Sequence, residues 1–211
     1  ITLAPERVSP EFIQRLIRHG MIVSAGHTEA SYDQMQIALA HGVTGFTHLF
    51  NAMSPMTSRE PGVVGAALEH ADSWCGLIVD GHHVHPVTLR QAIKAKAKGK
   101  MMLVTDAMHT VGQGAGRFDL MGGPIVSENG KVTTLNGTLA GSDLDMASAV
   151  RNTVQQVGLE LEEALRMASL YPAQFLKLDH KIGRIAKGFQ ADLVLIDDHM
   201  QVQQTWIKGE I

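Results

Sequence analysis

This 211-residue sequence has almost no cysteine, no long apolar segment and no excess of positive charge. The single cysteine, Cys75, cannot form an internal disulfide, which favours a reducing compartment such as the cytoplasm. No segment approaches the roughly 20 consecutive apolar residues of a membrane span, and residues 1–10 do not resemble a signal peptide. Lysine and arginine total 18 against 21 aspartates and glutamates. The sequence therefore predicts a cytoplasmic protein without the excess of positive charge that would bind nucleic acid or an anionic membrane.

The overall composition is that of a compact globular domain. Apolar residues make up 45% of the chain and charged residues 18%, which excludes disordered, collagen-like and coiled-coil proteins. The length allows a large core, but it falls short of the roughly 250 residues that a closed (β/α)₈ barrel usually takes. Because the chain begins at Ile1 rather than methionine, we expect the natural protein to be longer.

The first 110 residues repeat one pattern, in which a helix stopped by glycine precedes a short apolar strand. Alternation of this kind indicates a parallel sheet, whose buried strands are continuous apolar runs. We therefore predict an α/β fold with five strand–helix units. Helices are predicted over 10–19, 31–41 and 87–98, and strands over 1–5, 21–27, 43–49, 74–79 and 101–105.

Polar side chains follow these strands at nearly the same position. Counted from the glycine before each strand, His27 is the seventh residue, His48 the sixth and Asp106 the seventh. His83 follows the strand at 74–79. The carboxyl ends of parallel strands lie at one edge of the sheet, where such folds hold their active sites. We therefore expect these four side chains to lie close together at this edge of the sheet.

Two histidines and an aspartate at such an edge are typical of a metal site with a general base. Neutral imidazole is a good ligand for Zn²⁺ or Fe²⁺, and a bound zinc lowers the pKa of its water toward about 7. A catalytic zinc normally takes three protein ligands, but only His27 and His48 share the register, with His82 and His85 nearby. The third ligand is therefore expected in strands that precede this sequence.

Single residues of this set also have simpler explanations. A lone histidine is more often hydrogen-bonded or exposed than a metal ligand. Asp106 could cap a helix, and Arg59 could be a surface charge rather than a phosphate ligand. The shared register of His27 and His48 favours the metal site for these two.

The strand–helix pattern stops after residue 110. Glycine pairs and two Asn-Gly turn signals over 112–138 predict an inserted β-hairpin. Ser142 is predicted to cap a helix that ends at Gly158, and a second helix over 161–178 is interrupted by a proline. Alternating apolar and polar residues over 183–211 predict strands of a small β layer.

A series of short motifs occurs in order along the chain: Ser24–His27, Thr47–Met53, Arg59–Gly62, Asp80–His83, Leu103–Ala107, Leu139–Ser142, Ala168–Ala173 and Gly183–Asp197. Together they resemble the N-acetylglucosamine-6-phosphate deacetylase family of the amidohydrolase superfamily. The resemblance covers essentially the whole chain, and several motifs of four to seven residues in a fixed order make it specific.

The resemblance implies a metal-dependent (β/α)₈ TIM barrel with a small β-sandwich formed by both chain ends, usually as a homodimer. Residues 1–180 would then be a C-terminal portion of the catalytic barrel, with the hairpin insertion near 112–138. Residues 181–211 would be C-terminal strands of the small β domain. The family's glutamate ligand from an earlier strand has no counterpart here, so we expect a C-terminal fragment with open sheet edges.

The resemblance also implies a reaction in amino-sugar catabolism, hydrolysis of N-acetylglucosamine 6-phosphate to glucosamine 6-phosphate and acetate. His27 and His48 would bind the divalent metal, Zn²⁺ or alternatively Fe²⁺. Asp106 would be the catalytic acid and base, and His83 would hold the substrate carbonyl oxygen. Arg59 would bind the phosphate with Asn51 and Ala52, within reach of a neighbouring subunit. The substrate-binding set as a whole is Asn51, Ala52, Arg59, Asp80, Gly81, His82, His83, Leu139, Ala140 and Gly141.

Three other functions remain open. A deacetylase for N-acetylgalactosamine 6-phosphate differs by the orientation of one hydroxyl, which the motifs do not decode. An amidohydrolase with two metals bridged by a lysine is disfavoured, because no lysine follows a predicted strand. A catalytically incomplete half-barrel could instead complete its fold by binding another protein.

Overall fold

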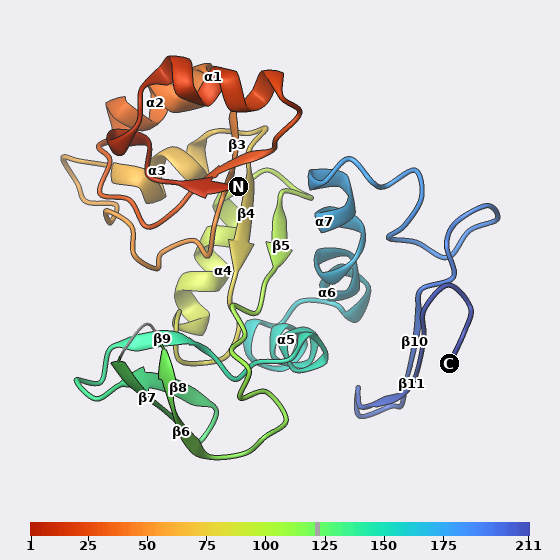
Figure 1. Ribbon diagram of the computed structural model, residues 1–211. Helices are drawn as coiled ribbons and strands as arrows, with labels where there is room; N and C mark the ends of the chain where they lie inside the picture. The colour runs from red at the N-terminus through yellow and green to blue at the C-terminus, as the bar shows by residue number, and fades with distance from the viewer. Residues whose placement is uncertain (121–122) are drawn as a thin grey trace.

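A five-stranded parallel sheet forms the centre of the computed structural model, which describes residues 1–120 and 123–211. The strands are adjacent in chain order and form an open sheet within the described residues (Figure 1). This confirms the predicted α/β class and its parallel sheet. The strands are β1 (Thr2–Leu3), β2 (Val23–Ala25), β3 (Val43–Phe46), β4 (Trp74–Leu77) and β5 (Met101–Leu103). The connecting helices are α1 (Pro10–Arg18), α2 (Tyr32–Ala40), α3 (Gly62–Glu69) and α4 (Pro86–Ala95), and a 3₁₀ turn, η1 (Pro5–Arg7), precedes α1.

The first helices begin where their capping residues predict. The Ser9 side chain accepts a hydrogen bond from the Phe12 amide at 3.3 Å at the start of α1. Ser31 and Gln34 cap α2 reciprocally, each side chain accepting from the other's backbone amide. Helix α3 was not predicted, because the sequence offers no side-chain cap at its start and the segment is short.

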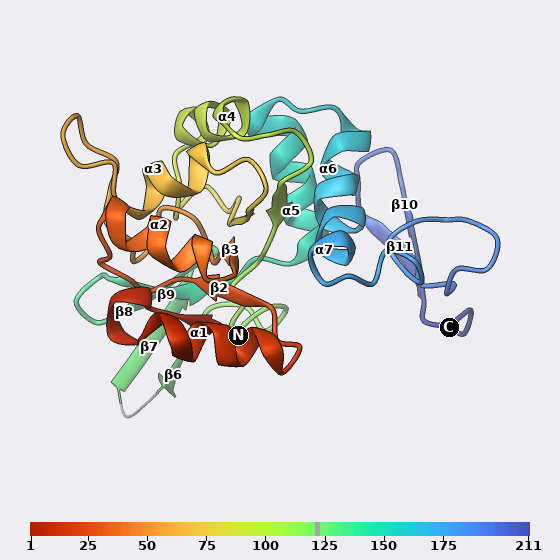
Figure 2. The ribbon, with the colours of Figure 1, turned by 90° about the horizontal axis from the view of Figure 1, so that it is seen from above.

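The core lies between the sheet and the helices that pack on its outer face. Figure 2 shows α1 to α4 and then the later helices following an arc around the strands. Helix α1 buries Ile13 and α2 buries Met35, against strand residues such as Val23 and Leu77. Burial of each such side chain stabilises the fold by about 1.5–3 kcal/mol. The helices thus fix the strands, and with them the loops at the strand ends.

The segment after β5 forms a four-stranded antiparallel sheet, larger than the hairpin expected near 112–138. The chain reverses direction at Gly130 and again at Gly137, where both glycines adopt positive φ, 75° and 80°. The second of these turns adds a further strand to the sheet. Residues 121–122 of the expected hairpin lie outside the described residues. The sheet lies beyond the carboxyl ends of β4 and β5 (Figure 1). Its strands are β6 (Gly116–Leu120), β7 (Gly123–Glu128), β8 (Lys131–Thr134) and β9 (Leu139–Ser142).

The expectation that Ser142 caps a helix is wrong. Ser142 is the last residue of β9, and the cap of α5 (Met146–Asn152) is Asp145, which accepts a hydrogen bond from the Ser148 amide at 2.9 Å. The helix continues as the π-helical turn η2 (Thr153–Val157). The following helical segment breaks at Ser169 rather than at its proline, because proline fits the first turn of α7. These helices are α6 (Leu161–Ala168) and α7 (Leu170–Phe175).

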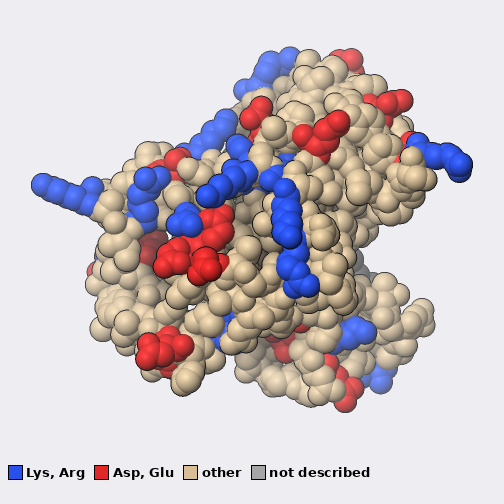
Figure 3. Space-filling model, turned by 180° about the vertical axis from the view of Figure 1, so that it is seen from behind, with Lys and Arg blue, Asp and Glu red and all other residues tan. Residues whose placement is uncertain are grey.

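The chain ends in an antiparallel pair, β10 (Leu193–Ile196) and β11 (Val202–Trp206), beside α6 and α7 (Figure 1). A groove of about 830 Å³ runs between this pair and the helices. Among the described residues, no helix has the length and apolar character needed to cross a bilayer. On the face seen in Figure 3, basic and acidic side chains lie next to one another.

Candidate active site

His27 and His48 meet at the carboxyl ends of β2 and β3. Their Nε2 atoms lie 2.9 Å apart, and the two rings are edge to face with centroids 4.7 Å apart. Both residues adopt positive φ, 50° for His27 and 34° for His48. This region costs a non-glycine residue about 1–3 kcal/mol and is found mainly at functional sites. The strained backbone turns both imidazoles toward one point.

The pair fits two ligands of one divalent cation. At metal–nitrogen distances of about 2.0–2.1 Å, two imidazole nitrogens on one ion lie about 3 Å apart, as these do. Burial lowers the pKa of His48, which keeps the ring neutral and able to coordinate. Its Nε2 is the nitrogen that faces His27, and its Nδ1 is buried with no hydrogen-bond partner among the described residues. Within residues 1–120 and 123–211, no three His, Cys, Asp or Glu side chains group as metal ligands.

Asp106 follows β5 and lines the same cavity as His48. The cavity has a volume of about 310 Å³, and its lining is mostly apolar, with Phe46 and Met102 among the apolar residues and Thr47 among the polar ones. Asp106 also adopts positive φ, 52°, and its side chain is exposed to solvent. Its negative charge partly offsets the effect of burial on the pKa of His48. The structure therefore brings together three of the four side chains expected at this edge of the sheet.

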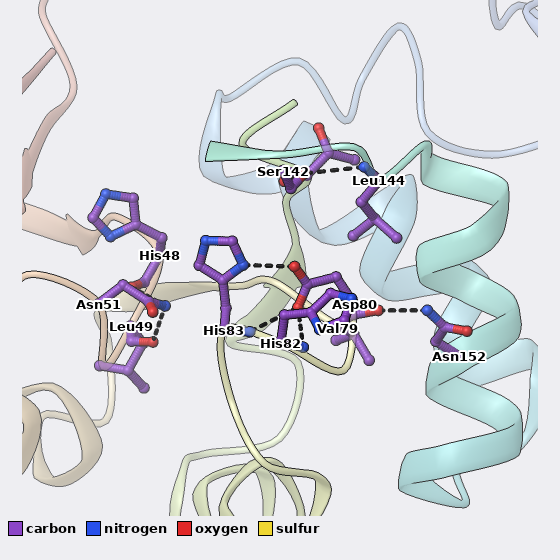
Figure 4. A network of polar contacts seen from close by, with 11 residues as sticks. His48, Leu49, Asn51, Val79, Asp80, His82, His83, Ser142, Leu144 and Asn152 are labelled. Atoms are coloured by element: carbon purple, nitrogen blue, oxygen red, sulfur yellow. Dashed lines mark hydrogen bonds and ion pairs between the residues drawn. The ribbon is translucent and has the colours of Figure 1, made fainter. Parts of the chain in front are cut away.

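His83, the fourth, is held by Asp80. The His83 Nδ1 atom donates to Asp80 Oδ2 at 2.6 Å, and Asp80 Oδ1 accepts the backbone amides of His82 and His83 at 2.8 and 2.9 Å (Figure 4). Burial alone would raise the pKa of Asp80, but these hydrogen bonds outweigh it and lower the pKa to about 2. Because an ionised carboxylate only accepts, the His83 proton is on Nδ1, and Nε2 is left for another partner.

The loop that carries Asp80 is tied to helix α5. The Asn152 side chain donates to the Val79 carbonyl at 2.8 Å (Figure 4), and Asn152 directly precedes the π-helical turn. Gly81 turns the loop at a positive φ of 80°. The His82 ring is exposed and lies near the β7–β8 turn. Asn152 was not expected at the site, since an asparagine within a helix carries no distinguishing pattern in the sequence.

None of the three residues expected to bind phosphate is among those that line the cavity, although Asn51 and Ala52 follow His48 on the loop after β3. The Asn51 side chain donates to the His48 and Leu49 carbonyls at 3.2 and 3.3 Å, which fixes the loop after β3. Ala52 adopts a positive φ of 48° and is exposed. Arg59 lies on an exposed loop before α3 and is not among the residues that line the cavity.

The end of strand β9, which carries Leu139, Ala140 and Gly141, reaches the Asp106 segment at Gly141 and Ser142. The Ser142 amide donates to the Asp106 carbonyl at 2.8 Å, and Ser142 forms a parallel bridge with Ala107. The backbone expected to line the sugar pocket therefore meets the segment that carries Asp106.

Comparison with known proteins gives a consistent set of relatives. The Amidohydrolase family model matches residues 5–211. An N-acetylgalactosamine-6-phosphate deacetylase from Shewanella sp. (strain ANA-3) is 46% identical over all of this chain and 53% of its own length. The crystal structure of N-acetylglucosamine-6-phosphate deacetylase from Pasteurella multocida has a TM-score of 0.96 and 41% identity, covering 100% of this chain and 55% of that one.

A mutant of the N-acetylglucosamine-6-phosphate deacetylase from Mycobacterium smegmatis, solved in complex with N-acetylglucosamine 6-phosphate, has a TM-score of 0.94 and 36% identity. The match covers 99% of this chain and 56% of that one. The chain thus spans about half the length of the relatives it matches.

Proposed function

This chain belongs to the amidohydrolase family, and we propose that it acts in the metal-dependent deacetylation of an N-acetylated hexosamine 6-phosphate. The observation that carries this proposal is the pair of imidazole Nε2 atoms 2.9 Å apart, with Asp106 lining the cavity of His48. N-acetylglucosamine 6-phosphate is the first candidate substrate, in agreement with the name of the Pasteurella relative. Its products would be glucosamine 6-phosphate and acetate.

His27 and His48 would hold the metal through their Nε2 atoms. A divalent cation bound there, Zn²⁺ in our proposal and Fe²⁺ as the alternative, lowers the pKa of water and polarises an amide carbonyl. The lowered pKa of His48 supports this role, because a neutral ring does not have to lose a proton before binding a cation. The glutamate that the family resemblance implies as a further ligand has no match in this sequence.

Asp106 would move the proton that the reaction requires. Its carboxylate takes a proton from water as the water oxygen attacks the acetamide carbonyl carbon. The same proton then passes to the amide nitrogen as the carbon–nitrogen bond breaks, which releases acetate and the free amine. The exposed position of Asp106 at the cavity mouth allows both transfers.

His83 would bind the substrate oxygen through Nε2. The bond from Nδ1 to Asp80 orients the ring, so that Nε2 would face the carbonyl oxygen as negative charge develops there. The two backbone amides fix Asp80 in turn.

The remaining site residues would bind the sugar phosphate. Leu139, Ala140 and Gly141 would line the sugar with their backbone, while Asn51 and Ala52 would lie near the phosphate. The exposed Arg59, away from its own cavity, fits a homodimer in which it reaches the phosphate of a neighbouring subunit. In this proposal residues 1–180 belong to the catalytic domain and residues 181–211 to the small β domain.

The galactosamine epimer is a second candidate substrate, and the 46% identical Shewanella relative favours it. Acetate release from both phosphorylated sugars, and from the unphosphorylated ones, tests the proposal in the complete enzyme with zinc added. We expect release that depends on the phosphate, and the faster epimer identifies the substrate. No acetate from either phosphorylated sugar, with metal bound, would reject the proposed reaction.

A further inference from the structure

We propose that Ser142 is a positioning residue that holds the backbone of Asp106 in its working conformation. The inference rests on the proposed function, because it gives Ser142 a role through Asp106 rather than a contact with substrate. From the sequence, Ser142 was expected at a helix start. The structure places it at the end of β9 with 1% of its surface exposed, beside the segment after β5.

Ser142 makes hydrogen bonds to three residues in and around Asp106, namely Thr105, Asp106 itself and Met108. Its Oγ atom donates to the Thr105 carbonyl at 2.5 Å, and its amide donates to the Asp106 carbonyl at 2.8 Å. The Ser142 carbonyl accepts a hydrogen bond from the Met108 amide at 2.8 Å. The Oγ atom also accepts the Leu144 amide at 3.1 Å, so the hydroxyl is fixed from both sides. One buried residue therefore fixes the chain before, at and after Asp106.

Asp106 needs such support because of its backbone conformation. Its φ of 52° lies in the left-handed region, which persists in a non-glycine residue only where the surroundings over-determine it. If the segment from Thr105 to Met108 relaxed toward negative φ, the Asp106 carboxylate would turn away from the cavity it shares with His48. Ser142 holds the Thr105 carbonyl, which precedes the Asp106 α-carbon, and the Asp106 carbonyl, which follows it.

Gly141 allows this close approach. A Cβ atom built on Gly141 would lie 3.1 Å from the Asp106 carbonyl oxygen and 2.7 Å from a Met108 side-chain carbon. Gly141 also has a φ of 94°, which glycine adopts without strain. The sequence Gly141-Ser142 thus combines a residue small enough to approach Asp106 with one that can bind its neighbours.

Ser73 provides a matched control for a purely structural serine. It is also 1% exposed, and its Oγ atom likewise makes two hydrogen bonds, donating to the His70 carbonyl at 3.0 Å and accepting from Lys96 Nζ at 2.8 Å. Ser73 precedes β4, so it lies at the opposite end of the sheet from the cavity mouth. Alanine at either position removes one buried hydroxyl and two hydrogen bonds.

The kinetic test compares Ser142→Ala with Ser73→Ala in the complete enzyme. Loss of a supporting hydrogen bond beside a catalytic group typically costs about 10- to 100-fold, so kcat of Ser142→Ala should fall by at least about tenfold. KM should stay within about twofold, since the substrate contacts remain. Ser73→Ala should lower thermal stability similarly and leave kcat within about twofold. Equal kcat for the two variants would overturn the proposal.

A second measurement does not depend on activity. Amide hydrogen exchange of residues 105–108 should accelerate in Ser142→Ala, which loses the side-chain bond to the Thr105 carbonyl, and stay unchanged in Ser73→Ala, whose hydroxyl bonds His70 and Lys96 instead. Unchanged exchange in Ser142→Ala would overturn the proposal whatever the effect of the substitution on acetate release. If the wild-type protein releases no acetate from either sugar, the proposed function fails, whereas the exchange result still decides whether Ser142 holds Asp106.

If Ser142→Ala does not fold, Ser142→Cys replaces it in both measurements. The thiol fills a similar space but is only a weak hydrogen-bond donor. We expect the same loss of kcat and the same faster exchange at residues 105–108. Wild-type values in a folded Ser142→Cys protein would overturn the proposal.

Discussion

The carboxylate of Asp80 gives a sharp test of the local electrostatics, because three hydrogen bonds converge on a side chain that is only 4% exposed. In Asp80→Asn the shape is kept and the charge is removed. The new amide could donate to His83 Nδ1 as well as accept from it, so the ring would no longer be held with its proton on that nitrogen. The substitution therefore separates the charge of Asp80 from its volume.

The size of the effect follows from the pKa of Asp80, which is lowered from 3.8 to about 2 in the folded protein. At 1.36 kcal/mol per unit, this difference stabilises the folded state by roughly 2 kcal/mol near neutral pH. Because the folded pKa is the lower one, the stabilisation is present above pH 3.8 and is lost as the pH falls toward 2. About half of it should remain near pH 3.

Urea unfolding of the wild type and of Asp80→Asn, between pH 3 and pH 7, measures this difference. We expect the gap in the free energy of unfolding to shrink by roughly 1 kcal/mol over that range. Asp197→Asn is the comparison: Asp197 also accepts two backbone amides, at 2.9 Å, but in an exposed turn. Those bonds also lower the pKa of Asp197, so we expect a smaller gap that shrinks in the same direction. A gap for Asp80→Asn that is independent of pH would refute the reasoning.

Other substitutions test the proposed roles one by one. Asp106→Asn should remove most turnover and leave metal content nearly unchanged, since it keeps the shape and loses the base; retained acetate release would exclude Asp106 from the mechanism. His48→Ala should lower bound metal as measured by elemental analysis, and unchanged occupancy would contradict its assignment as a ligand. Arg59→Ala should raise KM for the phosphorylated sugar far more than for the unphosphorylated one, and an equal loss on both would reject a phosphate contact.

The sequence was most informative where the chain repeats. Glycine stops, serine caps and apolar strands predicted the parallel sheet and its helices, because these signals are local and each unit repeats them. The shared register of His27, His48 and Asp106 was enough to predict that all three lie at one edge of the sheet. The structure gathers them there, with the Nε2 atoms of the two histidines 2.9 Å apart.

The sequence was misleading where a residue's partner lies far along the chain. Ser142 precedes a helix and looks like a cap, but its hydroxyl binds the Thr105 carbonyl, 37 residues earlier. Asn152 binds the Val79 carbonyl, 73 residues earlier, and no local pattern marks either contact. Helix α3 was missed for a related reason, since burial of its apolar residues rather than a side-chain cap stabilises it.

The sequence by itself determined the α/β class, the parallel sheet of five strands and the edge at which the histidines and Asp106 lie. These follow from periodicity and from stop signals that act within a few residues. Only the tertiary structure decided the facing of the two imidazoles, the pairing of Asp80 with His83 and the support of Asp106 by Ser142. Those features depend on positive φ values and on hydrogen bonds between distant segments, which form only when the whole sheet and its helices pack together.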